Sequence, residues 1–279
     1  MDTRQQHVVA FYARHPISAE HILKMLEARR GNLRDIRPEE LWDHDQDHYG
    51  GLAANEALAE CAELRAGLKV ADFCAGLGGP ARYFAARYGV DVTGIELTRA
   101  RVDGAVELTR AVGLQDRVRV VAGDVTAVPL ADGAVDVVLS QEALLHVPDK
   151  AKAVSEAARV LKPGGVLAFT DWVRHRALDP AEAQAMWTGI AAQTLQTIAG
   201  YKEILGAAGL QVVKVDDLTR DWGTILAERS RMYRQLREDA RKAGTPEGDD
   251  AFYEAYMKLV ELVQAGALGG ARFTARKPE

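Results

Sequence analysis

The sequence predicts an α/β protein built on a doubly wound, Rossmann-like sheet of seven strands. From residue 68 onward, short apolar runs alternate with helical stretches, which is typical of βαβ units with parallel strands. A glycine-rich turn, Gly76–Gly79, joins the first of these runs to a helix. The chain has 279 residues, of which 48% are apolar, and this is enough to bury the core of such a domain.

The N-terminal region is expected to be helical. Residues 3–30 have the apolar spacing of two helices, with a break at Pro16 and an end at Gly31. Five apolar runs after residue 68 are expected to be strands: Val70–Phe73, Val90–Leu97, Val118–Ala122, Val135–Ser140 and Val166–Asp171. The stretches between them are expected to form helices at Ala81–Arg87, Arg99–Val112 and Ala151–Leu161, and Leu161–Gly165 is expected to be a turn.

Two further strands are expected at Gln211–Val215 and Ala271–Ala275. The residues between them, about 221–266, have the pattern of two polar-faced helices, which indicates a helical lid inserted before the last strand. The expected organisation is therefore a helical cap at 1–51 and a sheet domain with its lid at 52–279.

Composition limits the classes of partner. A net charge of −5 argues against a nucleic-acid partner, since phosphate backbones are bound by basic surfaces. No apolar stretch is long enough to span a membrane, and the first residues do not have the pattern of a signal peptide. Cys61 and Cys74 do not make a disulfide framework, so a cytoplasmic location is expected. The oligomeric state is left open.

The segment Val70–Ala81 predicts a ligand site. It reads as a strand, a glycine turn and a helix whose first turn contains Pro80. Glycines allow a ligand to approach the backbone closely, and ligands of such sheets bind beyond the carboxyl ends of the strands. Gly76, Gly78 and Ala81 also satisfy the loose dinucleotide pattern G-x-G-x-x-A, so NAD is a competing ligand.

Acidic residues end the next two strands. Glu96 precedes Leu97 and is placed to accept the hydroxyls of a ribose. Asp124 precedes Val125, after the third strand, where a carboxylate can accept from an exocyclic adenine amine. Together with Asp72, these acids favour a nucleoside ligand other than NAD.

The segment Asp72–Gly78 resembles motif I of class I S-adenosylmethionine (SAM)-dependent methyltransferases, D-x-G-x-G-x-G, with Cys74 in place of the first glycine. Val138–His146 and Leu161–Asp171 extend the resemblance to the phosphoethanolamine and sarcosine/dimethylglycine N-methyltransferases, and residues 269–278 are similar to the ending of tocopherol-type enzymes. The resemblance implies SAM as cofactor and no metal. It implies these cofactor-binding residues: Asp72, Cys74, Gly76, Gly78, Glu96, Leu97, Asp124, Val125 and Gln141.

The residues after the fourth strand are candidates for the acceptor site. Glu142 is a candidate to hold a cationic amine, and His146, four residues on, is a candidate base that could share a helical face with it. By resemblance, His146 works with a tyrosine, and Tyr12 and Tyr49 are both candidates; Tyr49 is the one placed in the catalytic set. The phosphate-binding residues of phosphoethanolamine methyltransferases would fall near Ala191 and Gln193, so a phosphorylated acceptor is disfavoured.

The segment Trp42–Gly51 allows two interpretations. His44 and His48 have the i,i+4 spacing of metal ligands, but a third anchored ligand is missing. The resemblance favours a loop over the cofactor. The predicted activity is methyl transfer to a small-molecule acceptor, with an amine nitrogen as the favoured methylated atom. The alternatives are a carbon, oxygen or sulfur acceptor of more apolar character, a non-catalytic nucleotide-binding module, and a NAD-dependent oxidoreductase.

Overall fold

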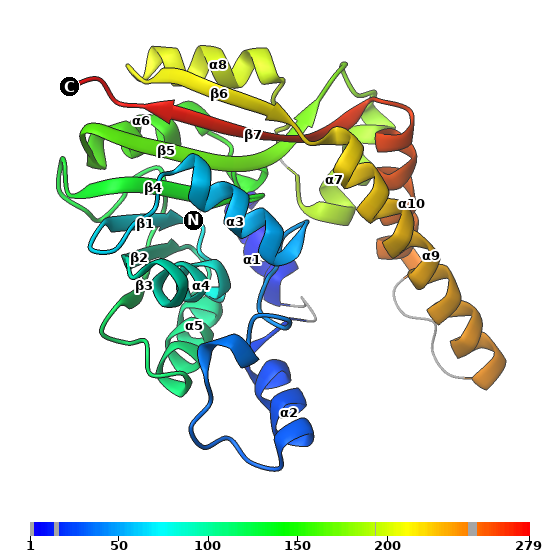
Figure 1. The fold of residues 1–279 in the computed structure, drawn as a ribbon. Coiled ribbons are helices and arrows are strands. Elements are labelled where there is room, and N and C mark those ends of the chain that lie inside the picture. Colours follow the sequence, from blue (N-terminus) through cyan, green and yellow to red (C-terminus); the bar gives the residue numbers. More distant parts are fainter. Residues whose placement is uncertain (1–2, 14–16, 193, 245–249) are drawn as a thin grey trace.

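The computed structural model describes residues 3–13, 17–192, 194–244 and 250–279, so the predicted break at Pro16 and the position of Gln193 lie outside the described residues. Its centre is the predicted seven-stranded sheet, in the order β3-β2-β1-β4-β5-β7-β6 (Figure 1). The strands are β1 Lys69–Phe73, β2 Asp91–Glu96, β3 Val118–Ala122, β4 Val135–Gln141, β5 Leu161–Arg174, β6 Gln211–Asp217 and β7 Leu268–Arg276.

The direction of the strands defines one edge of the sheet, the one at the carboxyl ends of the parallel strands, which we call the functional edge. The strands β1 to β5 pair in parallel, whereas β7 is antiparallel to both β5 and β6. The carboxyl ends of β1 to β5 therefore lie along one edge. The chain order reverses between β1 and β4, and a crevice opens at such a switch point.

Helices cover both faces, as expected of a doubly wound fold. On one face, α3 Gly51–Cys61, α4 Gly79–Tyr88 and α5 Arg99–Ala111 share a core with residues such as Val70 and Val92. On the other face, α6 Lys150–Val160 and α8 Ile198–Ala207 pack on residues such as Ala71 and Phe73. Successive residues of β1 thus enter opposite cores, which follows from the two-residue period of a strand.

Some elements differ from the prediction. β5 begins at Leu161, where a turn was expected, and it continues to Arg174 because β7 pairs with it along nine residues. The helices α3, α7 Pro180–Ile190 and α8 were not predicted. α3 is rich in alanine, so it lacks the strong apolar period that identifies a helix from sequence.

The predicted helical cap and lid lie next to the functional edge. The cap contains α1 Thr3–Ala13 and α2 Ala19–Arg30, and α2 packs on α5 through Ile22 and Leu26. The inserted helices are α9 Thr219–Ala243 and α10 Asp250–Gln264, which extend to one side of the sheet in Figure 1. Among the described residues, no helix combines the length and apolar character needed to cross a bilayer.

Candidate active site

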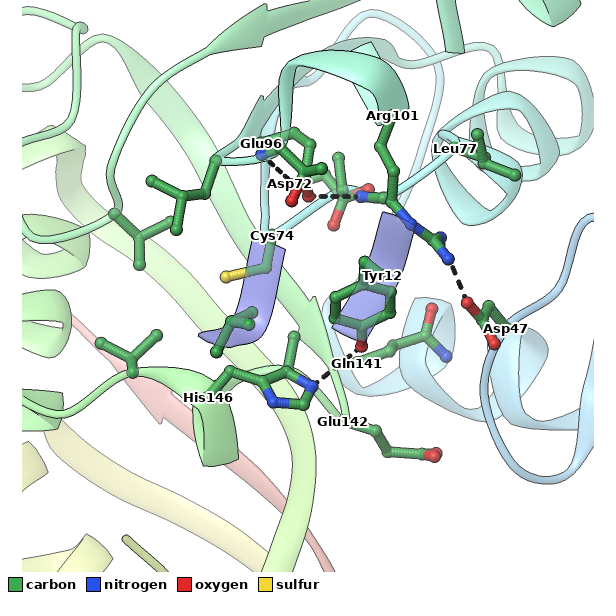
Figure 2. Close-up of a pocket in the computed structure, with 18 of the residues that line it drawn as sticks. Tyr12, Asp47, Asp72, Cys74, Leu77, Glu96, Arg101, Gln141, Glu142 and His146 are labelled. Atoms are coloured by element: carbon green, nitrogen blue, oxygen red, sulfur yellow. Dashed lines mark hydrogen bonds and ion pairs between the residues drawn. The ribbon is translucent and has the colours of Figure 1, made fainter. Parts of the chain in front are cut away.

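The glycine turn after β1 forms one wall of a pocket. Gly76 and Gly78 have φ values of 55° and 75°, in the left-handed region that glycine adopts without a steric penalty. Cys74, which stands where motif I has its first glycine, also has a positive φ of 60°. The backbone therefore keeps the glycine conformation although the residue has changed, and a thiol side chain points into the pocket (Figure 2).

The strain at Cys74 gives a stability prediction. A side chain in the left-handed region costs about 1–2 kcal/mol, so Cys74→Gly should remove most of that cost. Cys61 is the matched control because it ends α3 in a helical conformation, where glycine costs about 1 kcal/mol. We expect urea denaturation to show Cys74→Gly about 1–2 kcal/mol more stable than Cys61→Gly. A Cys74→Gly protein that is equally destabilised would contradict this account.

Glu96, at the end of β2, organises the neighbouring backbone. Its Oε2 accepts from the Gly76 N–H at 3.0 Å, and its Oε1 accepts from the Thr98 N–H at 2.7 Å. Asp72, at the end of β1, is buried and its Oδ2 has no hydrogen-bond partner among the described residues. Burial, with a smaller contribution from the Glu96 charge, raises the pKa of Asp72 to about 7. A buried carboxylate of this kind would be stabilised by a cationic ligand.

Asp124 lies at the end of the pocket beyond β3, beside Val125. Its Oδ1 accepts from the backbone N–H and the hydroxyl of Thr126 at 2.8 and 2.7 Å. Its Oδ2 accepts from Gln5 Nε2 of α1 at 2.6 Å. The Gln5 amide nitrogen thus donates to the same carboxylate that we expect to accept from an adenine amine. In Figure 2, α1 crosses the pocket, which Gln5 and Tyr12 both line.

The segment 42–51 packs against the glycine turn. A Cβ atom on Gly79 would lie 1.9 Å from the Asp45 carbonyl oxygen, so only glycine allows this approach. The buried Asp45 carboxylate pairs with Arg82 of α4 at 2.9 Å. Asp47 pairs with Arg101 of α5 at 3.2 Å. The ring nitrogens of His48 lie within hydrogen-bond distance of the Tyr49 carbonyl and the Gln46 amide oxygen, so the structure gives this residue protein partners.

His146 is held between two elements that are distant in sequence. Its Nδ1 lies 3.1 Å from the Ala191 carbonyl oxygen, and its Nε2 lies 2.8 Å from the Tyr12 hydroxyl. A carbonyl only accepts, so Nδ1 carries the proton and Nε2 of the neutral ring accepts from Tyr12. Burial lowers the pKa of His146 to about 4, and burial also raises the pKa of Tyr12. At neutral pH the pair is therefore an uncharged imidazole and phenol.

Of the two candidate tyrosines, Tyr12 contacts His146. Tyr49 instead packs between Trp172 and Trp222, with its ring beneath the guanidinium of Arg229. Tyr49 does not line the pocket formed by the described residues. The choice between the two tyrosines, which the sequence left open, thus falls on Tyr12, and the placement of Tyr49 in the catalytic set is corrected: its backbone N–H contacts Glu142.

Glu142 lines the pocket next to Gln141. Both of its carboxylate oxygens lie 3.0 Å from the Tyr49 backbone nitrogen, and burial raises its pKa well above the usual value. Glu142 has a positive φ of 53°, and the helical turn that follows it, before α6, is the short 3-10 segment η2 Leu144–His146. The expected common helical face with His146 is therefore wrong, although both residues line the same pocket.

The structure brings the predicted cofactor residues together at one pocket, except for Gly78, which lies in the same turn but does not line the pocket, and it adds others. Gln141 is among them, and neither its amide oxygen nor its amide nitrogen has a partner among the described residues. Gln5 and Arg101 were not predicted. An amide in a polar helix and an arginine in the first turn of α5 carry no signal that separates them from surface residues. The Ala191 carbonyl could not be predicted because a backbone atom has no sequence signature.

The fold is an α/β domain with a ligand pocket at the carboxyl ends of its parallel strands. Residues 71–169 match the family described as "Methyltransferase domain". This segment runs from β1 into β5 and contains the glycine turn, the three acids, Glu142 and His146. The resemblance to class I SAM-dependent methyltransferases is therefore confirmed.

Among its relatives, the chain is 34% identical over 172 residues to methyltransferase GfsG of Streptomyces halstedii, covering 61% of this chain and 62% of that protein. It is 30% identical over 178 residues to sarcosine/dimethylglycine N-methyltransferase of Aphanothece halophytica, covering 62% and 64%. The chain thus spans less than two thirds of the length of these relatives. Phosphoethanolamine N-methyltransferase 2 of Haemonchus contortus shares the fold, with a TM-score of 0.77 and 22% identity over 100% of this chain and 61% of that one.

Proposed function

We propose that the chain is an enzyme that transfers a methyl group from SAM to a small-molecule acceptor. The observation that carries this proposal is the set of three carboxylates, Asp72, Glu96 and Asp124, which line one pocket at the ends of three successive strands. A ligand with a cationic sulfonium and ammonium group fits this charge, whereas the anionic pyrophosphate of NAD would be repelled. The names of the relatives that match the chain support the same choice.

The pocket residues fit the parts of SAM. The unpartnered Oδ2 of Asp72 and the amide of Gln141 are suited to the amino-acid half, beside the glycine turn of Cys74, Gly76 and Gly78. Glu96 and Leu97 are suited to the ribose, and Asp124 and Val125 to the adenine. When bound, this cofactor supplies a methyl group already activated for transfer. The protein then has to hold the acceptor in line and remove a proton.

We propose an amine nitrogen as the atom that is methylated. Glu142, which lines the pocket, would hold the amine, because a carboxylate offsets the positive charge. The attacking nitrogen needs a free lone pair. Tyr12 would take the departing proton at its oxygen while it passes its own proton to Nε2 of His146, along the 2.8 Å contact between them.

The alternative is a more apolar acceptor that is methylated at carbon, oxygen or sulfur. Tyr49, Trp172, Trp222 and Tyr256 form a buried apolar cluster with α9 and α10, and the Tyr49 backbone joins this cluster to Glu142. If the cluster opens toward the pocket, it would offer an apolar wall to an aromatic or aliphatic acceptor. We propose that α9 and α10 act as the lid over the acceptor end and keep water from it. A cytoplasmic setting is also proposed, supported by the two free cysteines.

Titration calorimetry with SAM and with NAD tests the cofactor. We then expect labelled methyl groups to appear on members of an amine panel but not on phenols, thiols or carbon acids. Transfer to one of the latter panels alone would establish the alternative acceptor. SAM binding without transfer to any acceptor would indicate a non-catalytic module, and binding of NAD instead of SAM would overturn the proposal.

A further inference from the structure

The turn that carries His146 is fixed on both sides by buried charged residues. Asp171 of β5 is fully buried, and its Oδ1 accepts from the backbone N–H of Leu145 at 3.1 Å. Its other oxygen accepts from the hydroxyl of Tyr201. Lys150 of α6 is 3% exposed, and its Nζ donates to the carbonyl of Val147 at 3.0 Å. Leu145, directly before His146, is thus held by the acidic Asp171, and Val147, directly after it, is held by the basic Lys150.

Lys150 also reaches the segment that contacts the His146 ring. Its Nζ donates to Thr194 Oγ1 at 2.7 Å, three residues after Ala191. The Ala191 carbonyl is the acceptor that fixes the proton on Nδ1 of His146. Ala191 has a positive φ of 48°, a conformation that alanine adopts only when its surroundings hold it there. The Lys150 ammonium group therefore connects the turn that carries His146, through Val147, with Thr194, which lies close in sequence to Ala191. The Ala191 carbonyl in turn determines which nitrogen of the His146 ring carries the proton.

Burying an ammonium group is costly, and the hydrogen bonds of Lys150 within the described residues go to a carbonyl and a hydroxyl oxygen, neither of which is charged. Burial lowers the pKa of Lys150 to about 8, while Asp171 acts in the opposite direction. An apolar side chain would avoid this cost but would leave the Val147 carbonyl without the donation from Lys150. The lysine is therefore tied to the position of the turn that carries His146.

We propose that Lys150 is a positioning residue which, together with Asp171, holds His146 in the orientation and tautomer that leave Nε2 free to accept a proton. The consequence for catalysis rests on the proposed methyl transfer, but the placement of the ring does not. In this arrangement Lys150 does not contact the acceptor. It acts through Val147, Thr194 and the Ala191 carbonyl.

The test compares Lys150→Met with a matched variant on the same helix, Lys152→Met, whose side chain is 54% exposed. Nitrogen-15 spectra of the imidazole nitrogens, assigned with His146→Gln, report the tautomer and pKa of His146 without any acceptor. Tyr12, Asp47, Arg101 and Lys150 are the titratable or charged groups that face this ring. Losing the Lys150 charge should therefore raise the pKa of His146, because a nearby cation disfavours the imidazolium.

We expect Lys150→Met to reduce the Nδ1–H tautomer, to raise the pKa of His146 and to lower turnover by about 10- to 100-fold, with SAM affinity nearly unchanged. Lys152→Met should match the unmodified protein. A folded Lys150→Met protein with an unaltered His146 tautomer and pKa would overturn the proposal, even if its stability or turnover fell.

Thr194→Val keeps both charges and removes one hydrogen bond, so it decides the question if Lys150→Met does not fold. It should reduce the Nδ1–H tautomer while the pKa of His146 changes little, and an unchanged tautomer would count against the proposal. If the unmodified protein transfers no methyl group, the proposed function fails. The imidazole spectra would still decide whether Lys150 positions His146.

Discussion

Replacing His146 by alanine is expected to lower turnover by about 10²- to 10⁴-fold, the usual range for the loss of a general base. SAM affinity should change little, because the ring acts on the proton of the acceptor rather than on the cofactor. Tyr12→Phe should lower turnover in the same direction, since it removes the hydroxyl that donates to Nε2. Steady-state rates with labelled SAM and the acceptor found by the panel measure both variants.

The pH dependence follows from the pKa of His146. The base must be neutral to accept a proton, and it becomes protonated below its pKa. Burial lowers that pKa to about 4, so the acid limb due to His146 should lie below the usual imidazole value of about 6.5. The exposed His21 of α2 provides the control, because His21→Ala should leave rate and profile unchanged. Full turnover with an unaltered profile in His146→Ala would return this residue to a structural role.

Glu96→Ala is expected to weaken SAM binding by about 100-fold or more. Hydrogen bonds to a charged acceptor contribute about 1.5–3 kcal/mol each, and the variant removes the acceptor proposed for two ribose hydroxyls. It also releases the N–H groups of Gly76 and Thr98, which lie around the same part of the pocket. Calorimetric titration with SAM gives the affinity directly.

Asp103→Ala is the matched control for Glu96→Ala. Asp103 is an exposed acid of α5 that pairs with Arg99, so its removal changes the net charge equally without touching the pocket. Its SAM affinity should remain within about twofold of the unmodified protein, since exposed ion pairs contribute little. If both variants bind SAM as the unmodified protein does, the assignment of Glu96 to the cofactor is wrong.

The sheet could be predicted because each strand is a short apolar run between turn residues, and the glycine turn marked its ligand-binding edge. The acidic residues of the pocket could also be predicted, since Asp72, Glu96 and Asp124 each lie at or just beyond the carboxyl end of a strand. The partner of His146 could not be chosen from sequence, because Tyr12 lies 134 positions away and nothing in its helix indicates which way it points. The conformation of Glu142 could not be predicted either. The four-residue spacing of Glu142 and His146 suggests a helix, but the positive φ of Glu142 prevents a helix from including it.

The single helix α1 has a kinetic consequence. Gln5 contacts Asp124 at the adenine end of the pocket, and Tyr12 contacts His146 at the other end. His7, between them in sequence, stacks on Trp187 of α7 with ring centroids 3.9 Å apart. In the proposed function, an adenine amine can reach Asp124 Oδ2 only after the Gln5 side chain withdraws, whereas the proposed proton relay needs Tyr12 against His146. If the two side chains move together with α1, cofactor loading and proton transfer require different positions of this helix, and the rate of SAM entry is coupled to its movement.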